Sequence, residues 1–294
     1  MGMSEGLRAH IARGETTLCR CWAVTRRDGQ VFGFTDHDLP LSFEGIAFKA
    51  DSGLTAYALQ QTTGLSVDNS EALGALSDAG LSEADIEAGR FDQAEVQSWL
   101  VNWAEPSERW LQFRGSIGEI KRAGGAFEAE LRGLTEPLNA PMGRIYQKPC
   151  TAVLGDRACR FDLNQPGYSI VLPVERILED GRLEWGALDG FLPDWFARGR
   201  LSVLSGAAEG LWAAIKSDEA GDVGRVLGLW APLRAPLAVG DLVRLDAGCD
   251  KRAATCQQKF DNHLNFQGFP DIPGEDWMMA VPKSGQPNTG GSLR

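Results

Sequence analysis

The sequence repeats one local pattern, in which two strand-length runs of apolar and aromatic residues flank a tight turn. The turns are Arg27-Asp28-Gly29, Gly124-Gly125 and Asp180-Gly181. Glycine and aspartate are typical of short hairpin turns, because these turns require positive φ angles. Two further apolar runs, with Pro232 and Pro236 between them, extend the pattern. We therefore expect a mainly β fold, built as small barrels or sandwiches.

Only a few short helices are expected beside these strands. Ser82 suits the N-cap and Asp85 the first turn of a helix that ends near Ile86. A second short helix is predicted near Leu134 to Ile145. The last residues, 283–294, are rich in Gly, Ser, Pro and Asn and predict a flexible tail.

Composition and charge exclude several classes of protein. The chain has 294 residues and is 43% hydrophobic, which is ordinary for a chain that buries a core. No run approaches eighteen apolar residues, so we expect no membrane span. Residues 1–17 lack the apolar segment of a secretory signal, so synthesis in the bacterial cytoplasm is expected. The formal net charge of −11 argues against direct nucleic-acid binding, which favours a basic surface.

Four of the six cysteines form two spaced pairs in polar loops at strand ends. Eight residues separate Cys150 from Cys159, and six separate Cys249 from Cys256. The intervening chain reads as one closed β module, whose seam could bring both pairs together. Four thiolates suit zinc or an iron–sulfur cluster, but both spacings are wide for zinc, and known cluster motifs are also tight. Spacing alone therefore leaves zinc, a cluster, two disulfides and four unrelated thiols open, although a cytosolic origin disfavours disulfides.

The remaining cysteines and one acidic turn have simpler interpretations. Cys19 and Cys21 occupy alternate positions of a predicted strand, so both face one side of the sheet. A buried, small apolar side chain is the favoured interpretation of each. The run Asp36-His37-Asp38 could bind a divalent cation or pair across a subunit boundary, but a polar turn is favoured.

Several longer motifs occur together in this chain. From Cys249 to Pro270 the sequence follows C-D-K-R-x3-C-x2-K-F-x-N-x2-N-F-x-G-F-P. Upstream lie G-F-T-D-H-D at 33–38, A-D-I-E-A-G-R-F-D-x-A at 84–94, V-N-W at 101–103 and C-x3-L-G-D-x2-C at 150–159. This combination, which spans about residues 20 to 275, resembles the tail hub proteins of gene transfer agents and siphophage-like prophages. It is also similar to the lambda-type minor tail protein L.

The resemblance implies a structural protein in the tail baseplate of a virion or gene-transfer-agent particle. It implies a homotrimer whose ring joins the six-fold distal tail protein ring above to a three-fold fibre or central spike protein below. A cell-wall peptidase of the same tail is a further candidate partner. The implied domains are an N-terminal hub β domain at 1–160, a second β-barrel at 161–248, a cysteine-containing closing segment at 249–282 and the tail at 283–294.

The resemblance also implies a [4Fe–4S] cluster, with zinc as the alternative, in a metal-bound C-terminal segment. When the family motif is applied to this sequence, the implied ligands are Cys150, Cys159, Cys249 and Cys256. The cluster would act as a structural staple, because a cross-link that closes a loop of about a hundred residues stabilises by roughly 4–5 kcal/mol in the chain-entropy model.

The residues around these cysteines carry further expectations. The charges of Lys251 and Arg252 would offset the negative charge of a thiolate-bound cluster. The aromatic side chains would either cover the cluster or fill an ordinary core, and the two asparagines would cap turns. These residues are Phe260, Phe266, Phe269, Asn262 and Asn265.

Two other functions compete with a structural hub. A tail-tip cell-wall hydrolase could use Cys256, His263 and Asn265, which are close in sequence. No nucleophile or metalloprotease motif accompanies them, so we expect no enzyme. A host-glycan-binding module could use aromatic residues such as Trp195 between residues 185 and 212. The alternation there favours a strand pair of the second barrel instead.

Overall fold

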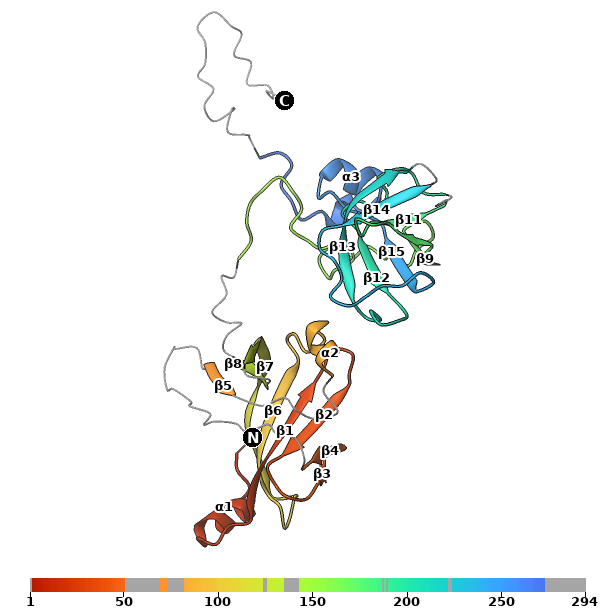
Figure 1. The fold of residues 1–294 in the computed structure, drawn as a ribbon. Coiled ribbons are helices and arrows are strands. Elements are labelled where there is room, and N and C mark those ends of the chain that lie inside the picture. Colours follow the sequence, from red (N-terminus) through yellow and green to blue (C-terminus); the bar gives the residue numbers. More distant parts are fainter. Residues whose placement is uncertain are drawn as a thin grey trace, which may run out of the picture. The chain divides into compact units, whose positions relative to one another are not determined.

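The computed structural model of this chain describes residues 2–50, 69–72, 82–123, 126–134, 143–186, 188, 190–221 and 224–272. The chain divides into two compact units, Met1–Met142 and Gly143–Arg294 (Figure 1). Both are built from mainly antiparallel sheets with a few short helices, which confirms the predicted mainly β fold.

The division falls at Met142–Gly143, whereas the resemblance implied a first boundary at residue 160. Residues before 160 join the second unit because they hydrogen-bond to the C-terminal segment. Cys150 N donates to Lys251 O at 2.8 Å, and Phe269 N donates to Gln147 O at 2.9 Å. Both cysteine pairs therefore belong to one folded unit, as does the described part of the segment predicted at 249–282. The predicted tail at 283–294 lies outside the described residues.

The first unit contains one eight-stranded sheet, with hairpin partners next to each other. The only parallel pair that the structure describes in this sheet is β2 with β4. The strand order is β3 (Leu41–Phe43), β4 (Ile46–Lys49), β2 (Val31–Thr35), β1 (Leu18–Thr25), β6 (Glu95–Asn102), β7 (Arg109–Ala123), β8 (Ala126–Gly133) and β5 (Asn69–Ala72).

Strand β1 is buried on both faces because apolar side chains occupy both sets of alternate positions. Trp22 belongs to a core cluster with Phe34 and Phe91. Cys19 and Cys21 belong to a second cluster, with Trp99 among its members. The two thiols are 6% and 0% exposed. The interpretation of these cysteines as small buried apolar residues is confirmed.

Short helices and turns follow local signals. Helix α2 (Glu83–Glu87) begins where predicted, and the Ser82 hydroxyl accepts from Asp85 N at 3.2 Å. Helix α1 (Glu5–Ala12) was not predicted; its residue Leu7 is fully buried. The polar turn predicted at Asp36-His37-Asp38 is present, and the Asp36 carboxylate accepts from Arg20 N at 2.6 Å.

Two features predicted in this region lie partly or wholly outside the described residues. Of the helix predicted at 134–145, residues 135–142 lie outside the described residues and 143–145 are not helical. The Gly124-Gly125 turn also lies outside them, but the strands on either side, β7 and β8, pair as a hairpin.

The second unit is a seven-stranded antiparallel sheet that curves round one core (Figure 1). The Trp185 indole N–H donates to Pro173 O at 2.8 Å, which links β11 near one edge to β9 at the other. Trp185, Leu201 and Ile215 are fully buried inside the curve. The order is β10 (Arg176–Ile177), β11 (Leu183–Trp185), β14 (Arg225–Leu229), β13 (Trp212–Ala220), β12 (Arg200–Val203), β15 (Leu242–Asp246) and β9 (Ser169–Pro173).

A buried ion pair fastens the 190s loop to this sheet. The Asp218 side chain is fully buried, and its Oδ2 lies 2.9 Å from Arg225 Nη2. The same carboxylate oxygen accepts from Phe196 N at 2.8 Å. Arg225 also donates to Phe191 O at 3.2 Å. The pair therefore holds β13, β14 and the loop together, with its carboxylate shielded from solvent.

We predict that Asp218→Ala lowers the free energy of unfolding of the second unit by about 3–5 kcal/mol, because the Arg225 charge stays buried without its partner. Urea denaturation followed by tryptophan fluorescence measures this loss. Asp180→Ala is the matched control, since it removes an exposed pair with Arg182. Equal urea midpoints for the two variants would contradict a stabilising role of the buried pair.

Candidate metal centre

The first cysteine loop, Cys150 to Cys159, is organised by the Leu-Gly-Asp of its motif. The Asp156 carboxylate accepts from Val153 N at 2.8 Å, from Ala158 N at 2.8 Å and from Cys159 N at 2.6 Å. Gly155 adopts a φ of +81°, which favours glycine at that position. The loop geometry therefore depends on two residues that lie between the cysteines.

The second pair lies on a turn and a helix. Cys256 is carried by α3 (Ala253–Gln258), where the sequence pattern indicated only a loop. A short 3-10 helix, η2 (His263–Asn265), follows. Lys251 adopts a left-handed φ of 67°, its backbone O accepts from Cys150 N, and its ammonium donates to Ala152 O. Lys251 thus connects the turn after Cys249 to the first loop.

Polar side chains join the two segments at several other points. Asn262 Nδ2 donates to Cys159 O at 2.7 Å, and the Thr151 hydroxyl donates to Gln267 O at 3.2 Å. Asn265 in turn donates from Nδ2 to Asn262 Oδ1 at 2.7 Å, which fixes the orientation of that amide. The two asparagines therefore position the first cysteine loop instead of only capping a turn.

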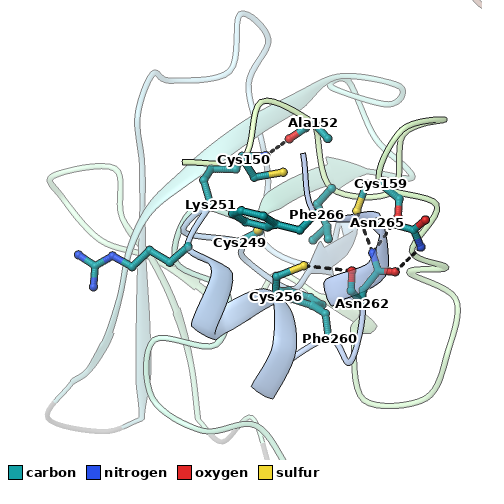
Figure 2. A pocket seen from close by; sticks show the side chains of 12 residues that line it. Cys150, Ala152, Cys159, Cys249, Lys251, Cys256, Phe260, Asn262, Asn265 and Phe266 are labelled. Carbon is teal, nitrogen blue, oxygen red and sulfur yellow. Dashed lines mark hydrogen bonds between the residues drawn. The ribbon is translucent and has the colours of Figure 1, made fainter. Parts of the chain in front are cut away.

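The four cysteines line one pocket between these segments. Figure 2 shows the thiols of Cys150, Cys159, Cys249 and Cys256 around it, with the Phe266 ring among them. Phe260, which is 3% exposed, forms another wall and packs against Phe161 and Tyr168. Of the three predicted aromatic residues, Phe269 instead contacts Tyr146, with ring centroids 4.7 Å apart.

Amide groups donate to two of the sulfur atoms. Gln267 N lies 3.4 Å from Cys150 Sγ, and Asn262 Nδ2 lies 3.5 Å from Cys159 Sγ. N–H donors to sulfur are among the contacts that tune iron–sulfur clusters. Cys256 differs, because its thiol donates to Asn262 O at 3.3 Å.

Burial disfavours charge on the other pair of thiols. Desolvation raises the pKa of Cys249. Desolvation, followed by the neighbouring thiols of Cys249, Cys159 and Cys150, raises the pKa of Cys256 to about 11. Without a cation these two groups therefore remain protonated at neutral pH, and binding of a metal would have to displace their protons.

The described residues contain no group of three or more His, Cys, Asp or Glu side chains placed to hold a metal ion. A tetrahedral zinc site needs sulfur atoms about 3.8 Å apart, given Zn–S bonds of about 2.3 Å. The donor set, with four sulfurs and no carboxylate, is one that both a four-cysteine zinc site and an iron–sulfur cluster take.

Lys259 ties the cysteine-bearing segment to the loops at Trp195 and Gly248, a contact that the sequence did not predict. Its ammonium donates to Trp195 O at 2.7 Å and to Gly248 O at 2.9 Å. It also lies 4.2 Å from the centre of the Trp195 ring. Burial lowers the pKa of Lys259 to about 8. The signal was present in the K-F of the C-terminal motif, but only the fold shows what the lysine contacts.

Trp195 was considered for glycan binding and His263 for catalysis, but neither side chain is placed as that function requires. The Trp195 ring carries the Lys259 ammonium over one face, and its indole N–H donates to Gly167 O at 3.1 Å. The ring of His263 stacks on Phe266, with centroids 5.9 Å apart, and the Cys256 thiol donates to a backbone carbonyl instead of the imidazole.

Comparison with known proteins identifies the class to which this protein belongs. The structure matches a solved chain described as "Virion of native gene transfer agent (GTA) particle", with 53% identity and a TM-score of 0.91 over 99% of this chain and 100% of that chain. A family model described as "Phage conserved hypothetical protein BR0599" matches residues 194–276. The fold and the cysteine segment thus define a phage-type particle protein.

The family itself follows from the first half of the chain. The family model "Baseplate hub protein, N-terminal attachment domain" matches residues 4–162. The chain belongs to this family of baseplate hub proteins, which confirms the resemblance found in the sequence. Its place is therefore the baseplate of a phage-like particle, with other particle proteins as partners. Among curated proteins, no sequence matches. None of the described helices is long and apolar enough to cross a membrane.

We predict that Asp156→Ala lowers the free energy of unfolding of the second unit by about 1–2 kcal/mol, because three N–H groups lose their acceptor at a partly exposed site. Hydrogen bonds, first from Cys159 N and then from Val153 N and Ala158 N, lower the pKa of this carboxyl. The stabilisation is therefore present above the usual range near pH 4 and is lost as pH falls through the lowered pKa. Urea midpoints from pH 7 to pH 2 measure both effects.

Asp162→Ala is the control for this prediction, because Asp162 accepts from Asn164 outside the cysteine loop. If Asp156→Ala retained the wild-type midpoint at pH 7, the three hydrogen bonds would not hold the loop.

Proposed function

We propose that this protein is a structural hub of a gene-transfer-agent-like tail, with a [4Fe–4S] cluster that staples its second unit. One observation carries the proposal: four thiols from two segments, separated by about 90 residues, line one pocket in a chain of the baseplate hub family. The match to a chain of a gene transfer agent virion supports the type of particle.

The residues present fit such a cluster. Cys150, Cys159, Cys249 and Cys256 would hold it, and Gln267 N and Asn262 Nδ2 already direct N–H groups at two of the sulfur atoms. When bound, the cluster would supply four iron–thiolate bonds that connect the two loops. Zinc is the alternative, because four cysteines also suit a single zinc ion.

The chain's own residues explain why the staple matters to this fold. The seam between the first loop and the C-terminal segment is held by isolated hydrogen bonds, such as Cys150 N to Lys251 O and Thr151 Oγ1 to Gln267 O, and by the packing of Phe161 against Phe260. No strand pairing reinforces it in the described residues, because α3 and η2 are the regular elements there. A bond network from both segments to one group would add binding free energy to folding.

The role is proposed to be structural and not catalytic. A catalytic thiol requires a lowered pKa and a base within hydrogen-bonding distance. Burial instead raises the pKa of Cys256, and its thiol donates to Asn262 O. Membership of a baseplate family supports the same conclusion.

The proposed assembly is a homotrimeric ring. It would join the six-fold distal tail protein ring to a three-fold fibre or central spike protein, with a cell-wall peptidase of the same tail as a further candidate partner. The family and the virion match support a position among other particle proteins. The trimer and the named partners are proposed.

The test is metal analysis of the wild-type chain and of Cys249→Ser after anaerobic purification. We expect a brown protein with a broad absorbance shoulder near ~400 nm and about four irons per chain, and Cys249→Ser should lose most of the iron. Cys19→Ala is the matched control, because it also removes one thiol, but from the core of the first unit instead of the pocket.

Three results would decide between the alternatives. Iron and sulfide in wild type but not in Cys249→Ser would support the cluster. About one zinc per chain, without colour, would retain the staple but replace the cluster. A metal-free wild-type protein with four free thiols would overturn the metal centre and leave the hub assignment on family membership alone.

A further inference from the structure

The outer face of the curved sheet in the second unit carries large apolar side chains that this unit leaves exposed. The strand register places Trp212 opposite Ser202, Ser202 opposite Arg244, and Arg244 opposite Val171. These side chains share one face, because directly paired residues point to the same side of a sheet. The residues between them, such as Leu201 and Leu245, are fully buried in the core.

Neighbouring rows of the same face are also apolar. Trp230 N donates to Ala214 O, so Trp230 lies beside the row of Trp212. Leu204 N donates to Leu242 O on the other side. Trp212 and Trp230 are 61% and 65% exposed, and Val171, Leu204 and Leu242 are exposed as well. We call these five residues, with Lys216, the basic aromatic face.

The charge of this face is opposite to that of the chain. Lys216 lies 5.7 Å from the Trp230 ring centre and is exposed. Among the outward positions of β9, β12 and β15 and residues 212–216 of β13, all of which the structure describes, the one carboxylate is Asp246. That carboxylate is 2% exposed and already pairs with Arg200 and Arg244. The face therefore presents tryptophan and positive charge with no accessible acid.

This composition favours a protein partner over a glycan. Tryptophan and arginine are enriched among the residues that dominate protein–protein binding energy. Sugars stack on aromatic rings but gain little from the aliphatic side chains of Val171, Leu204 and Leu242. The partner should be acidic, because the positive charge on the face attracts an acidic surface and repels a basic one.

The first unit of the chain is acidic in composition. Residues 1–142 include 21 Asp and Glu but 12 Lys and Arg, whereas residues 143–294 include 19 and 17. A positive face cannot pair with its own copy across a two-fold axis without like-charge repulsion. It can pair with a different surface of the next copy, and repeated heterologous contacts of this kind close into a ring.

We propose that the basic aromatic face of one copy binds the acidic first unit of a second copy, as the heterologous contact that closes the ring. The inference rests on the proposed hub function, because it assumes that copies of the chain form a ring. It adds the surface, the direction of the contact and the charge that selects it.

Sedimentation velocity of the full chain tests the contact. We expect the wild-type protein to self-associate, and the double substitution Trp212→Ala with Trp230→Ala to raise the dissociation constant by at least on the order of thirtyfold. Lys216→Glu should weaken association in the same direction, most clearly at low salt. Leu264→Ala and Lys148→Glu are the matched controls, because both change exposed residues away from this face.

Zero-length carbodiimide cross-linking of mixed 14N- and 15N-labelled chains tests the direction. We expect Lys216 to be joined to an Asp or Glu of residues 1–142 in mixed-isotope pairs. A monomeric wild type, unchanged association of the tryptophan variant, or Lys216 cross-links confined to residues 143–294 or to single chains would each overturn the proposal.

Iron content separates this proposal from the hub proposal. The tryptophan variant should retain wild-type iron and a wild-type thermal midpoint, because the face lies outside the cysteine pocket. Loss of association with iron retained supports the interface. Wild-type association in a protein without iron would contradict the metal centre and leave the interface standing.

Discussion

The second unit depends on hydrogen bonds between two segments that lie far apart in the sequence. Cys150 N to Lys251 O and Asn262 Nδ2 to Cys159 O bring the residues before the barrel against those after it. This contact completes the cysteine pocket, and it also explains why residues 143–160 fold with the C-terminal half. The curved sheet lies between these two segments in the sequence.

The motif residues around the cysteines mostly shape backbone and position side chains. Asp156 satisfies three N–H groups of the first loop, and Lys259 places its charge on two carbonyl oxygens of the barrel. Buried cations are costly unless fully hydrogen-bonded, so such a lysine specifies one arrangement of the segment. A structural centre needs this kind of support, because a loosely held pocket would bind metal without stabilising the fold.

The distribution of charge gives the two units different roles in an assembly. The first unit has the larger excess of acidic over basic residues, while the sheet of the second unit exposes tryptophan beside Lys216. A net charge far from zero favours solubility, and a single complementary face limits which surfaces can meet. Stapling and assembly would then use separate parts of the second unit, the pocket at the seam and the outer face of the sheet.

The sequence by itself determined the features that depend on neighbours along the chain. It predicted the hairpins at Gly29 and Gly181, the cap at Ser82 and the burial of Cys19 and Cys21, because turn chemistry, capping and strand alternation are local. Family motifs added the baseplate hub assignment. Only the tertiary structure decided that residues 143–160 join the second unit, that Cys256 lies on a helix, and that Lys259 contacts Trp195 O. The unit boundary and the Lys259 contact depend on packing between segments at least 64 residues apart, where local propensity carries no information about which surfaces meet.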